Sequence, residues 1–195
     1  DIGVRHRSRR IALDVMLFVL QYDDRIASTD TGQTTPDGRD IVQSVNGAES
    51  SIRGLEAGIE WSVSDRAGLL AVLNYTWGEQ RILNADAEAA DRIPPLHGRV
   101  ALQYDATRQY RIQSWLNFAA RQDRLSARDL RDVRIDPGGT AGWATVGAGV
   151  DKKLAAGWQL SLSFDNLLDK RYRRHGSGMD APGRSVSIRV RHTWQ

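Results

Sequence analysis

The sequence predicts an all-β protein, an antiparallel up-and-down transmembrane β-barrel, and three observations support this fold class. Apolar and polar residues alternate along most of the chain, which is typical of strands that bury one face. Several alternating runs reach about ten residues, enough to cross a membrane, whereas strands of soluble sheets have about five to six. The connections between these runs are alternately short and long, as they are in outer-membrane barrels.

About nine strands are expected, most of them with a repeat of two residues, whereas the strands at 10–23 and 143–151 have no clear polar face. In the clearest of them, Leu55 and Ile59 lie on one face, while Glu56 and Glu60 lie on the other. The expected strands cover residues 1–7, 10–23, 50–63, 68–80, 98–105, 109–121, 143–151, 158–172 and 184–194.

The long connections alternate with short turns along the whole chain. They lie near residues 24–49, 81–97, 122–142 and 173–183. Outer-membrane barrels have tight turns on the periplasmic side and long loops outside the cell. We therefore expect the long connections to gather at the extracellular end of the strands.

Aromatic residues lie near the ends of the expected strands. Tyr75 and Trp77 lie beside a long connection, and a second group lies beside the short turns. Because amphipathic rings are stable at the boundary between water and lipid, two aromatic girdles are predicted. The alternative is a soluble β-sandwich, in which such rings pack in a core. The second group consists of Trp61, Tyr104, Tyr110, Trp158 and Trp194.

The composition argues against several classes of protein. Without cysteine, the chain forms neither a disulfide framework nor a cysteine zinc site. The net charge of +3 is spread along the chain, which argues against nucleic-acid binding. No apolar run approaches the roughly 18 residues of a transmembrane helix. Motifs of nucleophilic, nucleotide-binding and zinc-dependent enzymes are also lacking, so we expect no catalytic residue, no cofactor and no resident metal.

Several short motifs resemble, in their order and spacing, those of one family. Asp165–Tyr172 resembles the N-L-hydrophobic-D-x-x-Y segment in the penultimate strand of TonB-dependent outer-membrane receptors. Ile93–Arg99 is similar to the family's PP-x-x-G-R segment, and Ile52–Glu56 is similar to its RG-hydrophobic-E strand start. Further segments that resemble the family's loops are Asp136–Thr140, His175–Gly178 and Pro182–Arg184.

The resemblance implies a larger protein than this chain. The family's barrel has 22 strands and encloses an N-terminal plug domain, which carries the segment that contacts TonB. Residues 1–195 would be the C-terminal portion of that barrel, and the plug domain is absent from this chain. The strand pattern starts at Asp1 without a signal peptide, as expected of a piece of a longer protein. Trp194 fits the terminal aromatic that the barrel-assembly machinery reads, although Gln195 follows it.

The function that the resemblance implies is active transport. A receptor of this family in the bacterial outer membrane binds a scarce nutrient, such as a ferric siderophore or another metal chelate, and imports it to the periplasm with energy from TonB. Such a protein is not an enzyme. The alternatives are a passive outer-membrane channel or translocator barrel without a plug, and a soluble β-sandwich binding module.

Candidate ligand-binding residues lie in the long connections. Arg124, Arg128 and Arg131 belong to one of them, and guanidinium groups bind carboxylates or phosphates in pairs of hydrogen bonds, as on an anionic metal chelate or lipopolysaccharide. His175 is the fourth candidate, and with Met179 it would suit copper. The alternatives are arginines that pair with the aspartates between them, and a polar loop histidine.

Charged residues on the strands are expected to face the inside of the barrel. An arginine against lipid costs about 2–4 kcal/mol at the middle of the membrane, so the polar face of each strand should turn inward. There these residues would solvate the lumen and contact the plug. The lumen-facing candidates are Glu56, Glu60, Arg111, Asn117 and Arg121, and Arg189 and Arg191 follow the same pattern.

Overall fold

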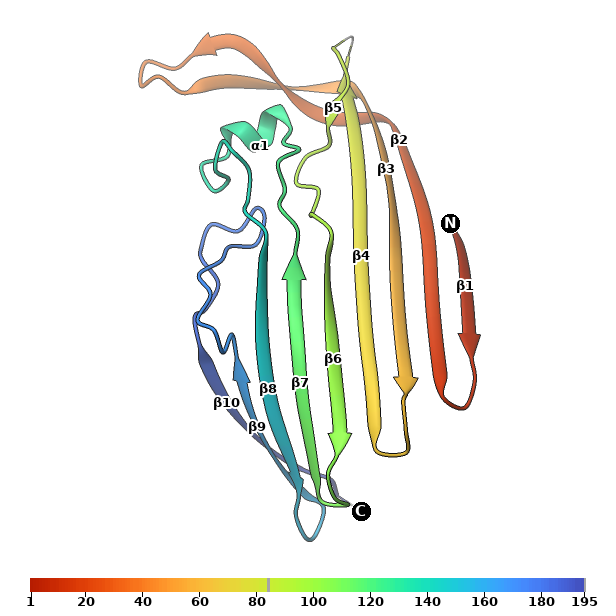
Figure 1. Cartoon of the computed structure of the whole chain (residues 1–195). Coiled ribbons are helices and arrows are strands. Elements are labelled where there is room, and N and C mark those ends of the chain that lie inside the picture. The colour runs from red at the N-terminus through yellow and green to blue at the C-terminus, as the bar shows by residue number, and fades with distance from the viewer. Residues whose placement is uncertain (84, 195) are drawn as a thin grey trace.

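A single antiparallel sheet makes up most of the computed structural model, which describes residues 1–83 and 85–194 (Figure 1). A short helix, α1, lies in one of the connections. The elements are β1 (Ile2–Arg7), β2 (Ile11–Thr34), β3 (Asp40–Ser62), β4 (Ala67–Ile82), β5 (Glu88–Ala89), β6 (His97–Asp105), β7 (Tyr110–Ala119), α1 (Ala127–Arg131), β8 (Trp143–Lys153), β9 (Trp158–Asp165) and β10 (Ser185–His192).

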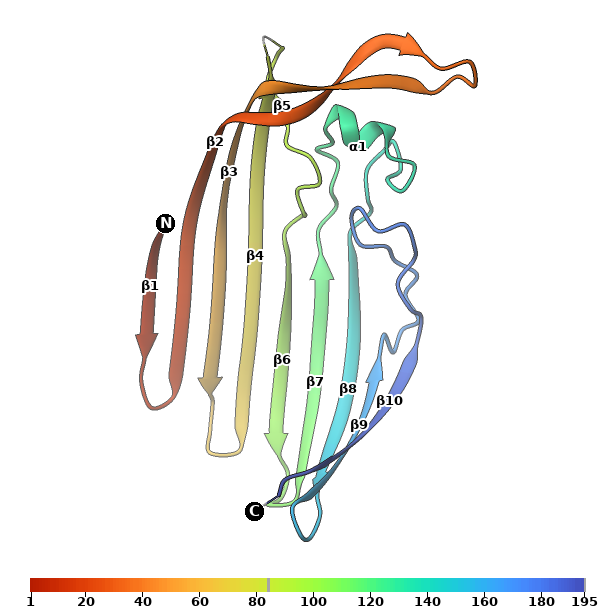
Figure 2. The ribbon, with the colours of Figure 1, turned by 180° about the vertical axis from the view of Figure 1, so that it is seen from behind.

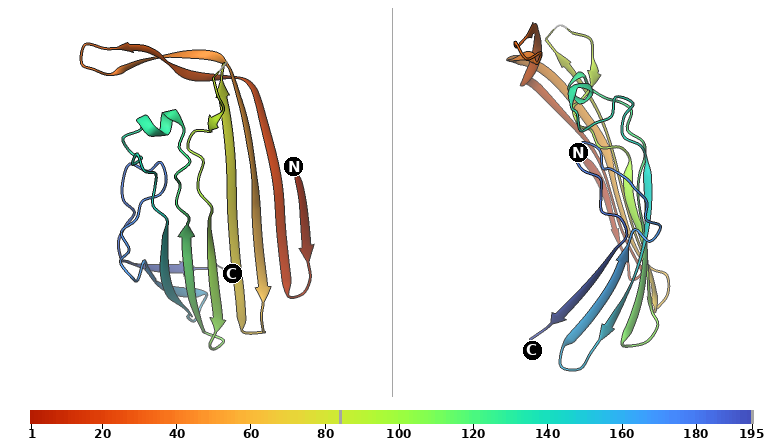
Figure 3. Two further views of the ribbon diagram at one scale, coloured as in Figure 1. Left: turned by 45° about the horizontal axis from the view of Figure 1, so that its top comes forward. Right: turned by 90° about the vertical axis from the view of Figure 1, so that its left-hand side faces the viewer.

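The strands follow one another across the sheet in the order in which they occur in the chain. The order is β1-β2-β3-β4-β6-β7-β8-β9-β10, and the two-residue β5 pairs with the upper part of β4. The sheet is curved and twisted like a section of a barrel wall, with both lateral edges open (Figures 2 and 3). The prediction of an all-β, antiparallel up-and-down arrangement is therefore confirmed, with β5 as a tenth strand that the sequence did not indicate.

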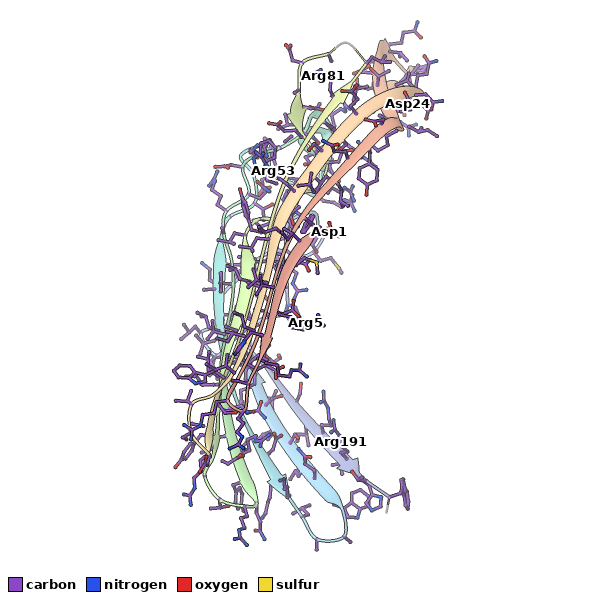
Figure 4. The ribbon with its side chains drawn as sticks, turned by 90° about the vertical axis from the view of Figure 1, so that its right-hand side faces the viewer. Asp1, Arg5, Asp24, Arg53, Arg81 and Arg191 are labelled. Carbon is purple, nitrogen blue, oxygen red and sulfur yellow. The ribbon has the colours of Figure 1, made fainter. Side chains whose placement is uncertain are left out.

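The register of the strands gives the sheet an apolar face. One row across it contains Leu13, Ile59, Ala71, Val100 and Leu116, which are direct neighbours on successive strands. Because side chains alternate along a strand, every second residue from these positions belongs to the same face. Arg53 marks this face as the convex one (Figure 4).

The opposite face is concave and polar. The adjacent row contains Arg5, Asp14, Arg99, Asn117 and Thr145, separated only by Gly58 and Val72. Arg5 and Arg191 point to the concave side (Figure 4). A curved sheet with charges inside and aliphatic side chains outside is the arrangement of a membrane barrel, and it is the reverse of a soluble one.

Many aliphatic side chains of the convex face are uncovered. Val4, Leu102, Ile112, Val186 and Ile188 are each at least half exposed, the last by 71%. An exposed apolar surface of this extent requires a covering layer. Neighbouring elements of the described residues do not provide one, whereas membrane lipid would.

The first long connection was predicted wrongly. Residues 24–49 were expected to be a loop, but β2 and β3 continue through most of this segment as a paired ribbon. Its outer part bends across the upper end of the neighbouring strands (Figures 1 and 3). Register shifts beside Arg25, together with the positive φ of 53° at Asp24 and 105° at Gly47, accompany the bend. Both faces of the ribbon are mostly polar, and its aliphatic residues, Ile26, Ile41, Val42 and Val45, form no regular repeat that marks it as strand.

Two strand ends also differ from the expectation. The strand expected over 158–172 ends at Asp165, because Asn166 and Asp169 take left-handed backbone angles of 50° and 52°. The strand expected over 109–121 ends at Ala119, so Arg121 lies in the following loop. Among the described residues no helix is long and apolar enough to span a membrane.

Candidate functional site

Trp115 is the central side chain of the upper concave face, and it is almost fully buried. Its ring lies flat over Gly147 and Gly149 of β8, where a Cβ on Gly147 would come within 2.2 Å of the indole. The indole Nε1 donates a hydrogen bond of 3.1 Å to Asp165 at the end of β9. The guanidinium carbon of Arg99 lies 5.1 Å from the ring centroid. Trp115 therefore forms a rigid floor that spans three strands.

A cavity of about 710 Å³ lies beside this floor, where the concave face meets the loops. The strands contribute Arg99 and Asn117, whose side chains are joined by a hydrogen bond of 3.1 Å. Trp143 begins β8, and its ring centroid lies 4.2 Å from that of Tyr172 in the last loop. Arg174 adds a second guanidinium group to the lining. The site thus combines two cations with two aromatic rings that pack against each other at an angle of 36°.

His175 is the one predicted ligand-binding residue that lines this cavity. Its Nδ1 lies 3.0 Å from the hydroxyl of Thr140, which links the last loop to the loop before it. Its Nε2 is buried without a hydrogen-bond partner among the described residues. Burial lowers the pKa of His175, and the nearby Asp129 opposes this by favouring the charged ring. Burial therefore favours the neutral form of the imidazole.

The predicted arginines of the 120–142 loop lie close to carboxylates. Arg128 pairs with Asp91 at 3.3 Å, and Arg124 approaches Glu79 at 3.6 Å. Arg131, in the last turn of α1, is exposed. Both carboxylates belong to other segments of the chain, so they are not the aspartates between the arginines that the alternative named. A ligand role for Arg124, Arg128 and Arg131 remains a prediction.

Arg134 belongs to the same loop and is held by Asp132. Its guanidinium donates to both oxygens of that carboxylate, at 2.8 and 2.6 Å. The hydrogen bonds from Arg134 hold the pKa of Asp132 well below its usual range, and Arg92 adds to the effect by its charge. Arg92 itself donates to Asp132 at 2.6 Å. Because Arg92 comes from the preceding loop, this carboxylate joins two loops.

Further contacts between the two loops lie at Asp129 and Gln122. Ser126 caps α1 by accepting a hydrogen bond from the Asp129 backbone at 3.0 Å, and the Asp129 carboxylate accepts in return from the Ser126 backbone. The same carboxylate accepts from the backbone N–H of Arg92 at 3.2 Å. Gln122 reaches the Ile93 carbonyl at 2.7 Å. We refer to these contacts between residues 88–93 and 122–134 as the loop clasp.

Several predicted lumen residues lie on the concave face. Glu56 and Glu60 are exposed there on β3. Arg111 donates two hydrogen bonds to Asp105, at 2.6 and 3.1 Å, across adjacent strands near the short turns. Asn117 lines the upper cavity, whereas Arg121 lies beyond the strand and donates to the Gly138 carbonyl.

The predicted interface aromatics lie on the convex face. At the lower end Trp61, Tyr104 and Trp158 are exposed beside the short turns. At the upper end Tyr75 is exposed, and Trp77 is partly covered by arginine side chains. Trp194 follows β10 and contacts His192 edge-on, with 4.3 Å between ring centroids. Gln195 lies outside the described residues.

Sequence reasoning missed Trp115, which lies beside the cavity, and several residues of the cavity lining. Trp115 interrupts the polar side of β7, so it was not assigned to either face. The spacing of Gly147 and Gly149 is a signal that could have found it, because glycines on one face of a strand make room for a ring on the neighbouring strand. Arg99 and Tyr172 each belong to a motif that resembles the family, but the motifs did not indicate that the two residues line one cavity.

An open antiparallel sheet with an apolar convex face and a charged concave face defines part of the wall of a transmembrane β-barrel. The family model described as TonB dependent receptor-like, beta-barrel, matches residues 1–167. The chain therefore belongs to the TonB-dependent receptor family, whose barrels are bacterial outer-membrane proteins. No curated protein matches the chain in sequence.

Solved structures share this fold. The chain is similar to the copper transporter OprC, with a TM-score of 0.79 and 23% identity over 96% of this chain and 29% of the other. For the FrpB iron transporter from Neisseria meningitidis the TM-score is 0.74 and the identity 14%, over 96% and 30% of the two chains. For the ferric-catecholate import receptor Fiu from K12 E. coli the values are 0.68 and 14%, over 96% and 26%. The chain thus spans less than a third of the length of these structures.

Proposed function

We propose that this chain is the C-terminal portion of the barrel of an outer-membrane receptor that imports a scarce nutrient with energy from TonB. The observation that carries the proposal is the cavity on the concave face, at the end of the strands where the loops gather. Strands fix its floor, and two loops close its upper side. Membership of the TonB-dependent receptor family supports an energised importer over a passive channel.

The chemistry of the cavity suits an anionic, partly aromatic metal chelate. Arg99 and Arg174 supply two guanidinium groups, which bind carboxylate or phenolate oxygens by charge-assisted hydrogen bonds. Trp143 and Tyr172 offer ring faces for stacking. A ferric siderophore fits this combination best. The copper transporter named above has the same fold, so the fold by itself does not select the metal.

The remaining partners follow from the same proposal. The lower concave face, which carries Glu56, Glu60 and Arg111, would contact a plug domain that lies outside this chain, and TonB would act through that plug. Trp194 would be read by the barrel-assembly machinery. The convex face would contact outer-membrane lipid and lipopolysaccharide.

The test uses the full receptor that contains this chain, in cells that lack their own metal-chelate receptors. Accumulation of radioactive ferric catecholate, ferric hydroxamate, haem and copper is compared with and without TonB. We expect one of these probes to accumulate only when TonB is present. Equal accumulation without TonB would identify a passive channel and reject the proposal.

Variants of the cavity test its role in binding. Arg99→Gln and Arg174→Gln should each weaken binding of the imported probe about tenfold, the usual effect of losing one charge-assisted hydrogen bond. Arg189→Gln is the matched control, because this arginine lies on β10 and is not part of the cavity lining. If all three variants bind as the wild type does, the ligand site lies elsewhere.

A further inference from the structure

Two arginines converge on one indole ring on the convex face. The guanidinium carbon of Arg53 lies 4.1 Å from the centroid of Trp77, and that of Arg124 lies 4.2 Å from the same centroid. Arg53 is on β3, directly opposite Trp77 on β4, whereas Arg124 reaches the ring from the 120–142 loop. Both guanidinium groups thus lie over the same indole ring, although they come from separate parts of the chain.

The pair lies at the upper border of the apolar face. One step down the strands, the direct neighbours are Leu17, Leu55 and Tyr75, which belong to the apolar rows. One step up, Ser51 lies opposite Glu79. An outward-facing arginine costs about 2–4 kcal/mol at the middle of a membrane and only about 0–1 near the interface. The transition places Arg53 and Trp77 at the level of lipid headgroups.

The local charges leave Arg53 without an acidic counterpart. Arg124 has Glu79 at 3.6 Å, and Arg81 lies directly opposite Glu49 on the neighbouring strand. Arg53 is exposed and forms no ion pair or hydrogen bond with the other described residues. Its guanidinium stacks on Trp77 and keeps its hydrogen-bond donors free in the direction of solvent and headgroups.

Attachment of the loop to the barrel explains Arg124 but does not explain Arg53. Arg124 ties its loop to β4 through Trp77 and Glu79, as a structural contact would. Arg53 already belongs to the sheet, so it anchors no loop, and it has no ion-pair partner among the described residues. An anionic group at this ring would supply the counter-ion that Arg53 lacks.

We propose that Arg53, Trp77 and Arg124 form a binding site for the phosphorylated headgroup of an outer-leaflet membrane lipid. The two guanidinium groups bind the phosphate, and the indole holds both at the border between headgroups and acyl chains. The apolar rows below the site, which include Leu17, Leu55 and Tyr75, accept the acyl chains. The inference rests on the outer-membrane placement given under the proposed function, but it does not depend on which nutrient is transported.

The experiment measures lipid retention by the full receptor in detergent. The probes are diphosphoryl lipid A, its monophosphoryl form and inorganic phosphate, and bound lipid is counted by native mass spectrometry. Arg53→Gln and Arg124→Gln should each lower the affinity for diphosphoryl lipid A about tenfold. Arg53→Lys should recover only part of it, because an ammonium group lacks the planar fork of donors.

Lys152→Gln is the matched control. Lys152 also lies over an aromatic ring, 5.2 Å from the centroid of Tyr110, but at the opposite end of the strands. This variant should retain lipid A as the wild type does. Electrophoretic mobility before and after heating shows that each variant is a folded barrel.

Several outcomes would overturn the proposal. If Arg53→Gln retains lipid A while Arg124→Gln alone loosens its loop, the cluster is only a loop anchor. If Lys152→Gln loses lipid A and the Arg53 and Arg124 variants retain it, the outer leaflet lies at the end of the strands that carries Lys152. Competition by millimolar inorganic phosphate would show a free-anion site. Because transport is not measured, failure here leaves TonB-dependent import standing, and failure of import leaves the lipid result standing.

Discussion

The indole Nε1 of Trp115 donates a hydrogen bond of 3.1 Å to the carboxylate of Asp165, and this one contact joins β7 to the end of β9 across β8. The strand between them passes under the ring because Gly147 and Gly149 have no side chains there. The position of Trp115 beside the cavity therefore depends on these two glycines as well as on Asp165.

Replacing Gly147 by alanine should displace Trp115 and destabilise the barrel. The new Cβ would lie 2.2 Å from two atoms of the indole, far inside van der Waals contact. Overpacking of this kind costs about 1–3 kcal/mol. The midpoint of thermal unfolding, followed by electrophoretic mobility of the full receptor, should fall. Gly58→Ala is the control, since its Cβ would meet only Val72 at 3.9 Å. Equal midpoints for both variants would show that the ring is not fixed by β8.

Replacing Asp129 by alanine should release the loop clasp. The carboxylate is buried and accepts from the backbone N–H groups of Arg92 and Ser126, so both donors would lose their partner. Exchange of these two amides with deuterium should become about tenfold faster or more. Asp136→Ala, at an exposed position of the same loop, should leave both rates unchanged. Unchanged protection in Asp129→Ala would mean that other contacts hold the loops.

The packing of the last loop should weaken in mildly acidic solution because of His175. Burial lowers the pKa of this histidine in the folded protein, so the unfolded loop binds a proton more readily. The loop therefore loses stability as the pH falls below about 6.5, the ordinary pKa of histidine. Asp129 favours and Arg92 disfavours the charged ring.

Hydrogen exchange of the Thr140 and His175 amides tests this pH dependence. After correction for the intrinsic effect of pH on exchange, protection at pH 5.5 should be lower than at pH 7.5 in the wild type. In His175→Gln the two values should agree. An equal loss of protection in both proteins would assign the effect to another group.

The sequence was sufficient to predict the two faces of the sheet. The repeat of two residues placed Leu55 and Ile59 opposite Glu56 and Glu60, and the register extends both faces across the neighbouring strands. Each strand residue faces either lipid or water, so the face to which it belongs can be predicted from the local sequence.

The outer ribbon of β2 and β3 could not be predicted in the same way. Both of its faces are mostly polar, and backbone hydrogen bonds across the hairpin determine how its residues pair. A search for strands with one apolar face therefore predicts a loop from Asp24 to Glu49.

The contacts between loops could not be predicted from the sequence pattern either. The aspartates between the arginines indicated that charges would pair, and Arg134 with Asp132 is such a local pair. Arg92 with Asp132, in contrast, joins residues 40 positions apart. Contacts of this kind depend on how the strands place their loops, which a single sequence does not give.

The central claim is that this chain is a barrel wall with lipid on its convex face and an aqueous lumen on its concave face. It is tested most directly by spin labels on β3 of the full receptor in a membrane, since the chain has no cysteine of its own. Labels at Ala57→Cys and Ile59→Cys should show high collision rates with oxygen, which dissolves in lipid. Labels at Gly58→Cys and Glu60→Cys should show low ones. Collision rates without a repeat of two residues, or with the opposite phase, would contradict the account.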